Sequence, residues 1–325
     1  PGHPAATELF LRRARESTRI TFTDSEDHDI DRLCQKLGGI PLAIEIAAAR
    51  SEVLTAGEMI AEIESTGVLP RSVDPSDDLR HQSVEHVLDW SYAMLDAEEQ
   101  RAFNRLTVFR GDFDLDAAAA VIGTSRPEST RLIGRLIASS MVTPIDTEFD
   151  RRRFRLLEPL RIYALSHLDD LEHVDARDSH AAHYRALCSA MPSSLKPDVS
   201  GGRARILRDD ANITAAIEHS LNSDDPEAAL AFADNIGDAW YRSGQYGRCH
   251  RVLTSMLDHG TAAPPAMRSS ARNALVWSAL ISGAADEAFA HISLAIEEAD
   301  EAADELALAF AQWSLAHMLV LSVGD

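Results

Sequence analysis

The sequence predicts a mainly α-helical protein, and three observations lead to this prediction. Apolar residues recur three or four positions apart, the spacing of an amphipathic helix, through most of the chain. Only 6% of the 325 residues are aromatic while alanine is abundant, and this bias favours helices that pack closely through small side chains. Apolar residues make up 45% of the chain, enough for two or three separate hydrophobic cores. We therefore expect several helical domains.

The first part, residues 1–70, is predicted to be a helical subdomain. The expected helices are Ala5 to Arg15, Asp29 to Leu37, one that opens at Pro41, and Thr55 to Ile63. The pair Gly38-Gly39 ends the second helix. Pro41 can occupy the first turn of the third helix, because its missing N–H would have no partner there. Thr55 is a good N-cap for the fourth helix.

A different pattern occupies residues 79–170, after the segment Val68 to Asp78, which is rich in Pro, Ser and Asp and is predicted to be a linker. Several helical stretches are followed by two short β-like runs, and a charged stretch separates these runs. The helices are Val84 to Met94, Glu98 to Phe109, Leu115 to Ile122 and Thr130 to Ser139, and the runs are Met141 to Ile145 and Phe154 to Leu157. Helices followed by a two-stranded ribbon are typical of a winged helix, so we predict that domain here.

From His180 onward the pattern is helical throughout, and tryptophans give it a period. Trp240, Trp277 and Trp313 are separated by 37 and 36 residues, and a glycine follows each of the first two at a predicted helix–helix turn. Tetratricopeptide units have a period of about 34 residues with Trp, Gly and Tyr in similar order. We therefore expect degenerate repeats of that type over 178–325. Each repeat buries its apolar face only against its neighbours, so the three tryptophans are expected in the core.

Charge and composition limit the partners and the compartment. The net charge of -21 disfavours nonspecific attraction to nucleic acid, which needs clustered Lys and Arg. No run approaches the roughly 18 apolar residues of a membrane span, and the N-terminus lacks a signal-peptide pattern. We expect a cytoplasmic protein that makes no membrane contact. The cysteines Cys34, Cys188 and Cys249 have no paired spacing and are expected to be buried small hydrophobes.

Two histidines are candidate metal ligands. His180 and His183 lie three positions apart, a spacing that can place two imidazoles on one face of a helix. No further carboxylate or cysteine completes a convincing ligand set. We therefore expect surface histidines and no metal site.

Several segments, taken in order, resemble the STAND NTPases of NB-ARC type, a group that includes plant resistance proteins, apoptotic ATPases and actinobacterial regulators of the LuxR and AfsR types. The most specific is Leu37 to Glu45, Leu-Gly-Gly-Ile-Pro-Leu-Ala-Ile-Glu, which is similar to the family's GLPLA segment. The others are Ala5 to Arg15, Arg80 to Tyr92, Phe103 to Phe113, Arg155 to Ala164 and Leu207 to His219. The resemblance covers nearly the whole chain.

The resemblance implies a nucleotide contact at Gly39, Ile40 and Pro41, because the family's proline lies against adenine and ribose. Taken by themselves, the same residues form a helix C-cap and a helix-opening proline between two packed helices, and both interpretations can hold together. The family often has a histidine near the end of its winged helix that reads the nucleotide's phosphate. Here Leu157 stands at that position and Glu158 follows, so this chain departs from the family.

The phosphate-binding loop of the family is missing. No G-x-x-x-x-G-K-[S/T] occurs in the sequence, and no strand ending in paired acidic residues precedes Pro41 to hold Mg²⁺. Those parts of the family lie N-terminal to the Pro41 motif, and both ends of the chain look cut, so we expect a fragment of a longer protein. The chain should not hydrolyse ATP or bind a cofactor itself, and the longer protein is expected to use ATP or ADP with Mg²⁺.

The leading hypothesis is a regulatory switch that ADP holds closed and that a protein or small-molecule inducer on the repeats opens. DNA would be contacted only by domains outside this chain, and a nucleotide-dependent oligomer is compatible with such a switch. The alternative is a protein-interaction scaffold without nucleotide dependence. A third hypothesis, a free-standing repressor that contacts DNA through Arg131, Arg135 and Arg151 to Arg153, is opposed by the acidic charge; in the family the winged helix usually acts as a lid over the nucleotide.

Overall fold

The computed structural model describes residues 4–17, 24–65, 88–145, 152–190 and 201–322, in which the chain forms two compact units. The first unit comprises Pro1–Val108 and Asp112–Ala176, and the second comprises Phe109–Gly111 and Arg177–Asp325. The chain therefore crosses between the units three times. The predicted linker 68–78 lies outside the described residues, and the division into domains at 1–70, 79–170 and 178–325 stays a prediction.

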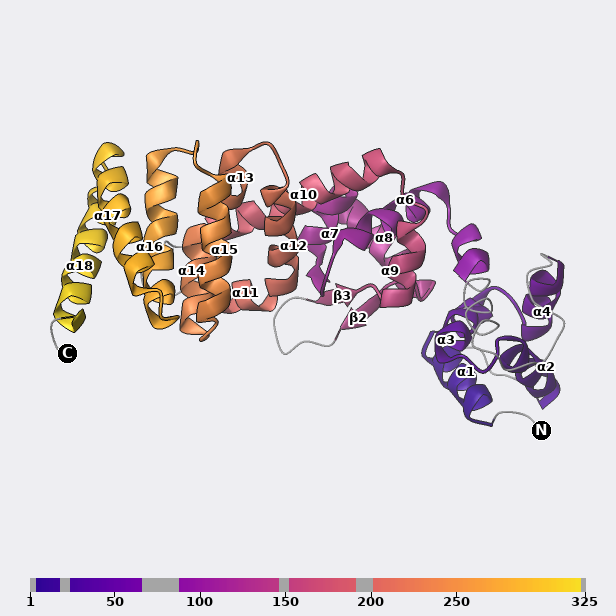
Figure 1. The fold of residues 1–325 in the computed structure, drawn as a ribbon. Coiled ribbons are helices and arrows are strands. Elements are labelled where there is room, and N and C mark those ends of the chain that lie inside the picture. Colours follow the sequence, from indigo (N-terminus) through magenta and orange to yellow (C-terminus); the bar gives the residue numbers. More distant parts are fainter. Residues whose placement is uncertain (1–3, 18–23, 66–87, 146–151, 191–200, 323–325) are drawn as a thin grey trace. The chain divides into compact units, whose positions relative to one another are not determined.

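The first unit begins with a group of short helices (Figure 1). They are α1 (Pro4–Ser17), α2 (Asp24–Lys36), α3 (Pro41–Ala49), the 3-10 turn η1 (Arg50–Glu52) and α4 (Ala56–Ser65). The helix α1 packs on α3, and α2 packs on α4, with Phe10, Leu33 and Ile44 fully buried between them. Thr55 caps α4 as predicted: its hydroxyl accepts from the Glu58 N–H at 3.3 Å, and the Glu58 carboxylate accepts from the Thr55 N–H at 2.8 Å.

Residues 88–93 are helical and are followed by a winged-helix arrangement. Its elements are α6 (Ala97–Arg105), the 3-10 turn η2 (Leu106–Val108), β1 (Phe113–Asp114), α7 (Leu115–Ile122), α8 (Arg126–Ala138), β2 (Thr143–Ile145), β3 (Arg153–Arg155) and α9 (Glu158–Leu165). Local signals set the ends of these helices. Asp96 and Glu99 form a capping box at the start of α6, and Gly123, at a φ of 79°, ends α7.

The two predicted β-like runs form β2 and β3, which pair as an antiparallel ribbon as predicted, but the sheet also contains a third strand, β1, which the sequence did not predict. Its order is β1-β3-β2, all antiparallel, and Phe113 lies opposite Phe154 with their ring centroids 6.1 Å apart. The missed strand, β1, is only two residues long, too short to show an alternating pattern. The helix α8 also begins before the predicted Thr130, because the Ser125 side chain caps it.

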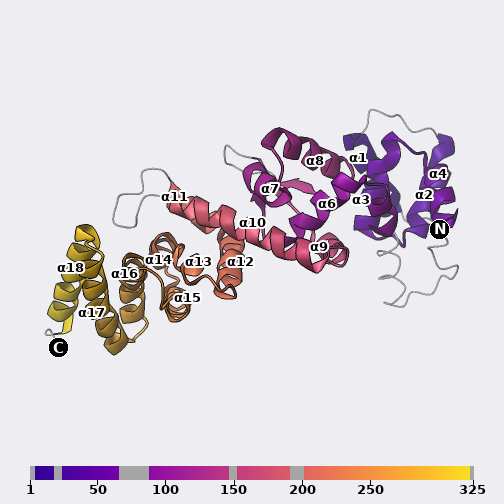
Figure 2. The same cartoon turned by 90° about the horizontal axis from the view of Figure 1, so that it is seen from above.

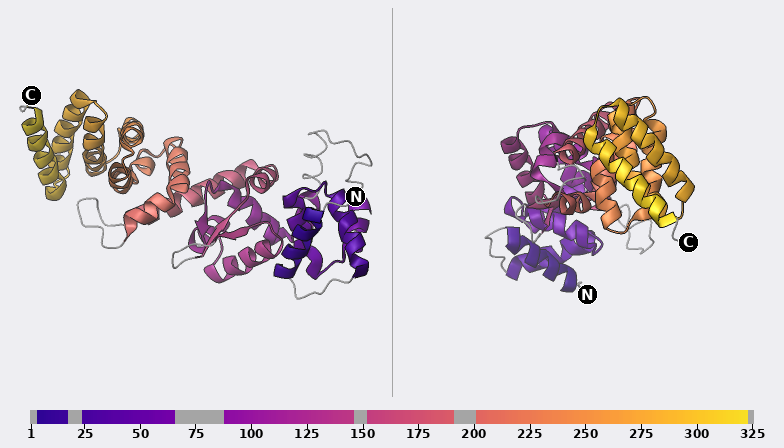
Figure 3. Two further views of the ribbon diagram at one scale, coloured as in Figure 1. Left: turned by 90° about the horizontal axis from the view of Figure 1, so that it is seen from below. Right: turned by 90° about the vertical axis from the view of Figure 1, so that its left-hand side faces the viewer.

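The second unit is built of helices that follow one another as hairpins. After α10 (Asp170–Ser189), which starts in the first unit, come α11 (Gly202–Arg208), α12 (Asp210–Leu221), α13 (Pro226–Leu230), α14 (Ala233–Arg242), α15 (Tyr246–His259), α16 (Pro265–Ile281), α17 (Ala285–Glu301) and α18 (Glu305–Ser322). Figure 2 and the left view of Figure 3 show α14 to α18 lying side by side. Gly244 and Gly283 have φ values of 80° and 86° at the α14–α15 and α16–α17 turns, as the repeat pattern predicted.

The three tryptophans differ in burial, which corrects the prediction that all lie in the core. Trp240 is fully buried, whereas Trp313 on α18 is 55% exposed. Trp277 is partly buried and packs on Trp313 with ring centroids 5.9 Å apart. The period identifies an equivalent face on each repeat, but burial requires a neighbour on that face. Trp313 also stacks on Phe310 and His317 of its own helix and still stays exposed.

The fold class is confirmed: the protein is mainly helical, with a winged helix and stacked helical hairpins. All three cysteines are free and buried, as expected. None of the described helices combines the length and the apolar content that a membrane crossing needs.

Candidate functional site

The turn between α2 and α3 contains the residues that the sequence analysis predicts as nucleotide contacts. Gly38 and Gly39 have φ values of 66° and 67°, a conformation that favours glycine. The Gly39 N–H donates to the Cys34 carbonyl at 3.0 Å, and the Gly38 N–H donates to the Gln35 carbonyl at 3.0 Å. The predicted helix cap is therefore confirmed.

The start of α3 is exposed among the described residues. Pro41 is exposed and opens the helix, and the Ile40 carbonyl accepts the Ile44 N–H at 3.0 Å. No side chain caps this helix end. A Cβ added at Gly39 would meet no atom of the described residues within 4 Å, so these residues would let a flat ligand approach the backbone here. The structure contains no ligand, and the nucleotide contact at Gly39, Ile40 and Pro41 stays a prediction.

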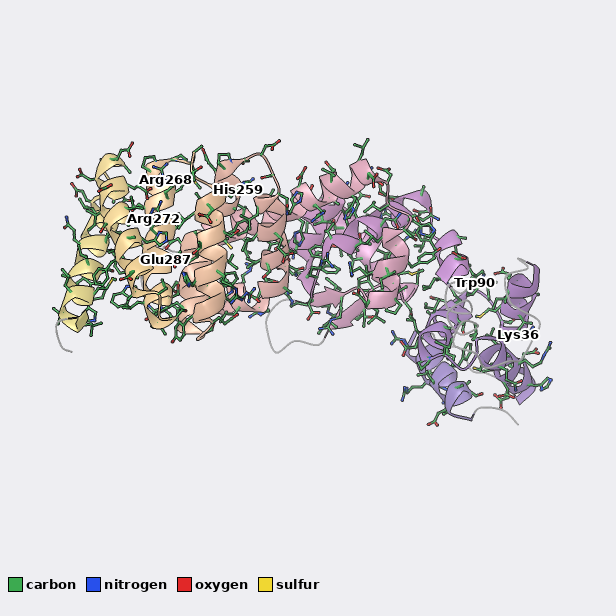
Figure 4. The ribbon with its side chains drawn as sticks, in the orientation of Figure 1. Lys36, Trp90, His259, Arg268, Arg272 and Glu287 are labelled. Atoms are coloured by element: carbon green, nitrogen blue, oxygen red, sulfur yellow. The ribbon has the colours of Figure 1, made fainter. Side chains whose placement is uncertain are left out.

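Two polar contacts join this helical group to residues 88–93. Arg50 donates from Nη2 to the Ser91 carbonyl and hydroxyl, each at 3.2 Å, and the Trp90 ring N–H donates to Glu62 at 3.0 Å. Figure 4 labels Trp90 and also Lys36, the last residue of α2. Burial lowers the pKa of Arg50, while nearby Glu99 and Glu62 oppose this shift. The contacts link the helix that follows Pro41 to the chain leading into the winged helix.

Leu157, the residue before α9, stands where the resemblance to STAND NTPases implies a histidine. The Glu158 carboxylate that follows is engaged by Arg161, whose Nη2 and Nε lie 2.6 and 2.9 Å from its two oxygens. The acidic group is therefore held by a neighbour in its own helix. Nothing at Leu157 can hydrogen-bond a phosphate through its side chain.

The exposed arginines of α8, which is the third helix of the winged-helix fold, are paired with carboxylates of α8 itself or of neighbouring elements. Arg131 contacts Glu98 and Glu128, and Arg135 lies 2.7 Å from Glu99. Arg126 at the start of the helix lies 2.8 Å from Asp116. A surface on which each of these arginines meets an acid presents little net positive charge to a DNA phosphate backbone.

The three arginines predicted to lie on the wing, Arg151 to Arg153, are not all exposed in the structure. Arg151 lies outside the described residues, and Arg152 is exposed. Arg153 is 4% exposed and donates from Nη2 to the Asp112 carbonyl. Of these three arginines, only Arg152 is described and exposed, and so free to contact a DNA phosphate.

His180 is buried in the second unit, so the prediction of surface histidines was wrong for this residue. It is 2% exposed, and its ring meets the Phe109 ring edge-on at 5.3 Å and the Tyr184 ring at 4.8 Å. Burial lowers the pKa of His180 to about 3, so the ring is neutral near pH 7. Among the residues that the structure describes, no group of His, Cys, Asp and Glu has the geometry of a metal site.

A row of charged side chains, which no sequence pattern predicted, crosses α15, α16 and α17. Arg268 and Arg272 both bind the Glu298 carboxylate, at 2.8 and 2.9 Å, and all three side chains are less than one-fifth exposed. The row continues through His291 and Glu287 to His250 on α15. Arg268, Arg272 and Glu287 are labelled in Figure 4.

Hydrogen bonding fixes the protonation of His291 in this row. Arg272 can only donate, so the Nδ1 atom of His291, 2.7 Å away, accepts. The other ring nitrogen, Nε2, then carries the proton and faces Glu287 at 3.6 Å. Glu287 also accepts from His250 at 2.9 Å, and both histidines contribute to lowering its pKa. The row fastens three helices together and leaves no lone pair on Nε2 of His291 for a metal.

Comparison with known proteins identifies one part of the chain. Residues 95–169 match the winged helix-turn-helix domain. This match covers α6 to α9, including β1, β2 and β3.

Three relatives and one solved structure extend the comparison. Proteins of Mycobacterium tuberculosis and Mycobacterium bovis that carry the provisional name HTH-type transcriptional regulator are each 30% identical over 279 residues, 82% of this chain and 31% of the relative. An uncharacterized Mycobacterium tuberculosis protein is 33% identical over 181 residues, 53% of this chain and 44% of that protein. The chain thus spans less than a third of the length of the first two relatives.

The solved structure is a Signal Transduction ATPase with Numerous Domains (STAND) protein with a tetratricopeptide repeat sensor from Pyrococcus horikoshii. It covers 98% of this chain and 51% of its own, with 12% identity and a TM-score of 0.36. Similarity at this level supports no conclusion about function.

Proposed function

We propose that this chain is the switch and sensor part of a signal-transducing regulator whose output is transcriptional control. One observation carries the proposal: a winged helix whose α8 arginines are already paired with acids lies in the same compact unit as an open, glycine-rich turn at Pro41. Such a winged helix is suited to an internal contact rather than to DNA. The relatives' names support a regulatory role.

The nucleotide half of the proposal concerns the turn at Gly39, Ile40 and Pro41. ADP, held by a preceding phosphate-binding domain with Mg²⁺, would place its base and ribose against Pro41, where no described residue lies close to an added Cβ at Gly39. Hydrolysis would belong to that domain, and this chain would contribute no catalytic residue. The helix start at α3 adds a weakly positive end that favours an anionic ligand.

The sensor half concerns the helical hairpins of the second unit. A protein or small-molecule inducer that binds them would favour an open, ATP-bound state. Because a ligand shifts an equilibrium only by its differential affinity, moving a mostly closed population to a mostly open one requires about 5 kcal/mol of preference for the open state.

The test of the nucleotide half uses the longer polypeptide that includes the roughly 150 to 200 residues expected before Pro1. Pro41→Ala should weaken ADP binding about tenfold in calorimetry, through loss of one apolar contact of about 1.4 kcal/mol. Pro226→Ala is the matched control, since Pro226 also opens a helix, α13, in the other unit. Unchanged ADP affinity in Pro41→Ala would reject the contact, and no ADP binding by any version would favour the scaffold without nucleotide dependence.

A second candidate function is DNA binding by the winged helix itself. The match of residues 95–169 and the names of the relatives favour it. The net charge of -21 and the paired arginines of α8 oppose it. A gel shift at low salt decides: tight binding by this chain would establish this candidate, and none is expected.

A further inference from the structure

His291 of α17 lies between an arginine and a carboxylate, both within the second unit. The Nη1 atom of Arg272, on α16, donates to Nδ1 of His291 at 2.7 Å. The Glu287 carboxylate, one turn earlier on α17, lies 3.6 Å from Nε2 of the same ring. The side chains of His291 and Arg272 are 15% and 14% exposed, so solvent screens this pair only weakly. The neutral ring with its proton on Nε2 fits both neighbours.

Protonation of His291 removes this fit. The charged imidazole carries a proton on both nitrogens, so Nδ1 and Arg272 become two donors that face each other without an acceptor between them. Two positive charges at this distance also repel each other, most strongly where solvent is largely excluded. Arg272 must then leave His291, while its Nε atom can keep the Glu298 carboxylate at 2.9 Å.

The charges of the row balance only while its histidines are neutral. The positive charges of Arg268 and Arg272 match the negative charges of Glu298 and Glu287. His250 on α15 brings a second imidazole, whose Nε2 lies 2.9 Å from Glu287. A proton added to His250 therefore meets a carboxylate, whereas a proton added to Nδ1 of the other histidine meets an arginine.

The groups around His291 act together against its charged form. Burial lowers the pKa of His291, the arginine beside it lowers it further, and Glu287 opposes this shift. His250 on α15 adds to the lowering. The helix α18 also packs on α17, and its titratable side chains, Glu305 and His317, are not among the groups that shift this pKa.

We propose that His291 is a pH-sensitive lock between α16 and α17: the neutral ring holds Arg272 and keeps the two helices packed, and the protonated ring releases it. As the pH falls below 6.5, the unfolded chain takes up this proton before the folded chain does, so the packing of α16 on α17 weakens. The proposal rests on the proposed function only in taking the hairpins as the sensor. Such a sensor responds to acid as well as to its inducer.

Hydrogen exchange at pH 7 and pH 5 tests the lock on the chain of 325 residues. His291→Gln keeps an oxygen that can accept from Arg272 but cannot take up a proton in this range. On acidification, the protection factors of α16 and α17 should fall at least about threefold more in the unaltered chain than in this variant. The buried His180 affects both proteins equally, so the difference between them isolates His291.

His250→Gln is the matched control. It replaces the other histidine that contacts Glu287 and leaves the contact between Arg272 and His291 intact. The fall in protection should therefore persist in this variant. An equal fall in the unaltered chain and in His291→Gln, or a fall that His250→Gln also removes, would overturn the proposal.

A second measurement uses the unaltered chain alone. NMR of the ring nitrogens of His291 should show the proton on Nε2 at neutral pH and a titration midpoint below 6.5, the ordinary value. A proton on Nδ1, or a midpoint above 6.5, would contradict the lock. None of these measurements needs nucleotide or inducer, so failure of the lock is distinguishable from failure of the proposed function.

Discussion

The winged helix and the helical hairpins use charged residues in opposite ways. In the winged helix, Arg131 and Arg135 of α8 lie at the surface with side chains 40% and 57% exposed and meet carboxylates there. In the hairpins, Arg268, Arg272 and Glu298 are 10–19% exposed and bind one another between helices. Exposed pairs add little stability but set what the surface attracts, whereas buried pairs are costly to break. The first arrangement therefore bears on partner choice and the second on holding the repeats together.

The largest effect is expected at the buried end of this comparison. Trp240→Ala removes a fully buried ring whose N–H donates to Asp210 at 2.7 Å. The Cζ atom of Arg248 lies over this ring, 4.1 Å from its centroid. The free energy of unfolding of the second unit should fall by about 3–5 kcal/mol in urea denaturation. Trp313→Ala, the matched change at a 55% exposed tryptophan, should cost less than about 1 kcal/mol. Equal costs would contradict the observed difference in burial.

The buried His180 predicts a pH dependence. Its pKa is about 3 in the folded state against 6.5 as the ordinary value, so the folded state binds fewer protons. Above pH 6.5 the neutral ring costs the folded state nothing. As the pH falls from 6.5 toward 3, the free energy of unfolding decreases by about 1.4 kcal/mol per pH unit. His180→Phe should flatten this part of the stability curve, measured by urea denaturation between pH 7 and pH 4. An unchanged slope would mean that His180 is not the group responsible.

A smaller effect distinguishes two glycines of the first unit. Gly39 has a φ of 67°, so Gly39→Ala should lower the free energy of unfolding by about 1 kcal/mol. Gly134 lies inside α8 with no atom within 4 Å of an added Cβ, so Gly134→Ala should raise it by about 0.5–1 kcal/mol. Thermal unfolding measures both changes in stability. Stabilisation by Gly39→Ala would contradict the positive φ of Gly39 in this turn.

The smallest stability change is expected at the exposed end of the comparison. Glu98→Gln with Glu128→Gln removes both carboxylates that contact Arg131, and all three side chains are 40–49% exposed. Thermal unfolding should be nearly unchanged, while weak DNA binding should appear at low salt. DNA binding that is equally strong in the unaltered chain would show that the acids do not shield α8.

Local signals explain what could be predicted from the sequence. The helix α7 runs over the predicted residues because Asp114 caps its start and Gly123 its end. The turn at Gly38, Gly39 and Pro41 was predicted from the same kind of signal and from the family resemblance.

Long-range contacts explain what could not be predicted. His180 packs against Phe109, which lies in a distant part of the sequence, and no pattern around His180 predicts that contact. The charged row of α15 to α17 forms only when three helices pack, so its residues look like ordinary surface charges along the chain. A period of tryptophans gives equivalent positions without saying which of them a neighbour covers, and this is why Trp313 was placed wrongly.

The most direct test of the central claim is calorimetric titration of ADP and ATP into two proteins. One is the chain of 325 residues, and the other is the longer polypeptide with the roughly 150 to 200 residues expected before Pro1. The nucleotide switch predicts binding by the longer protein alone, with the site completed by the turn at Pro41. Absence of binding by both proteins would contradict it.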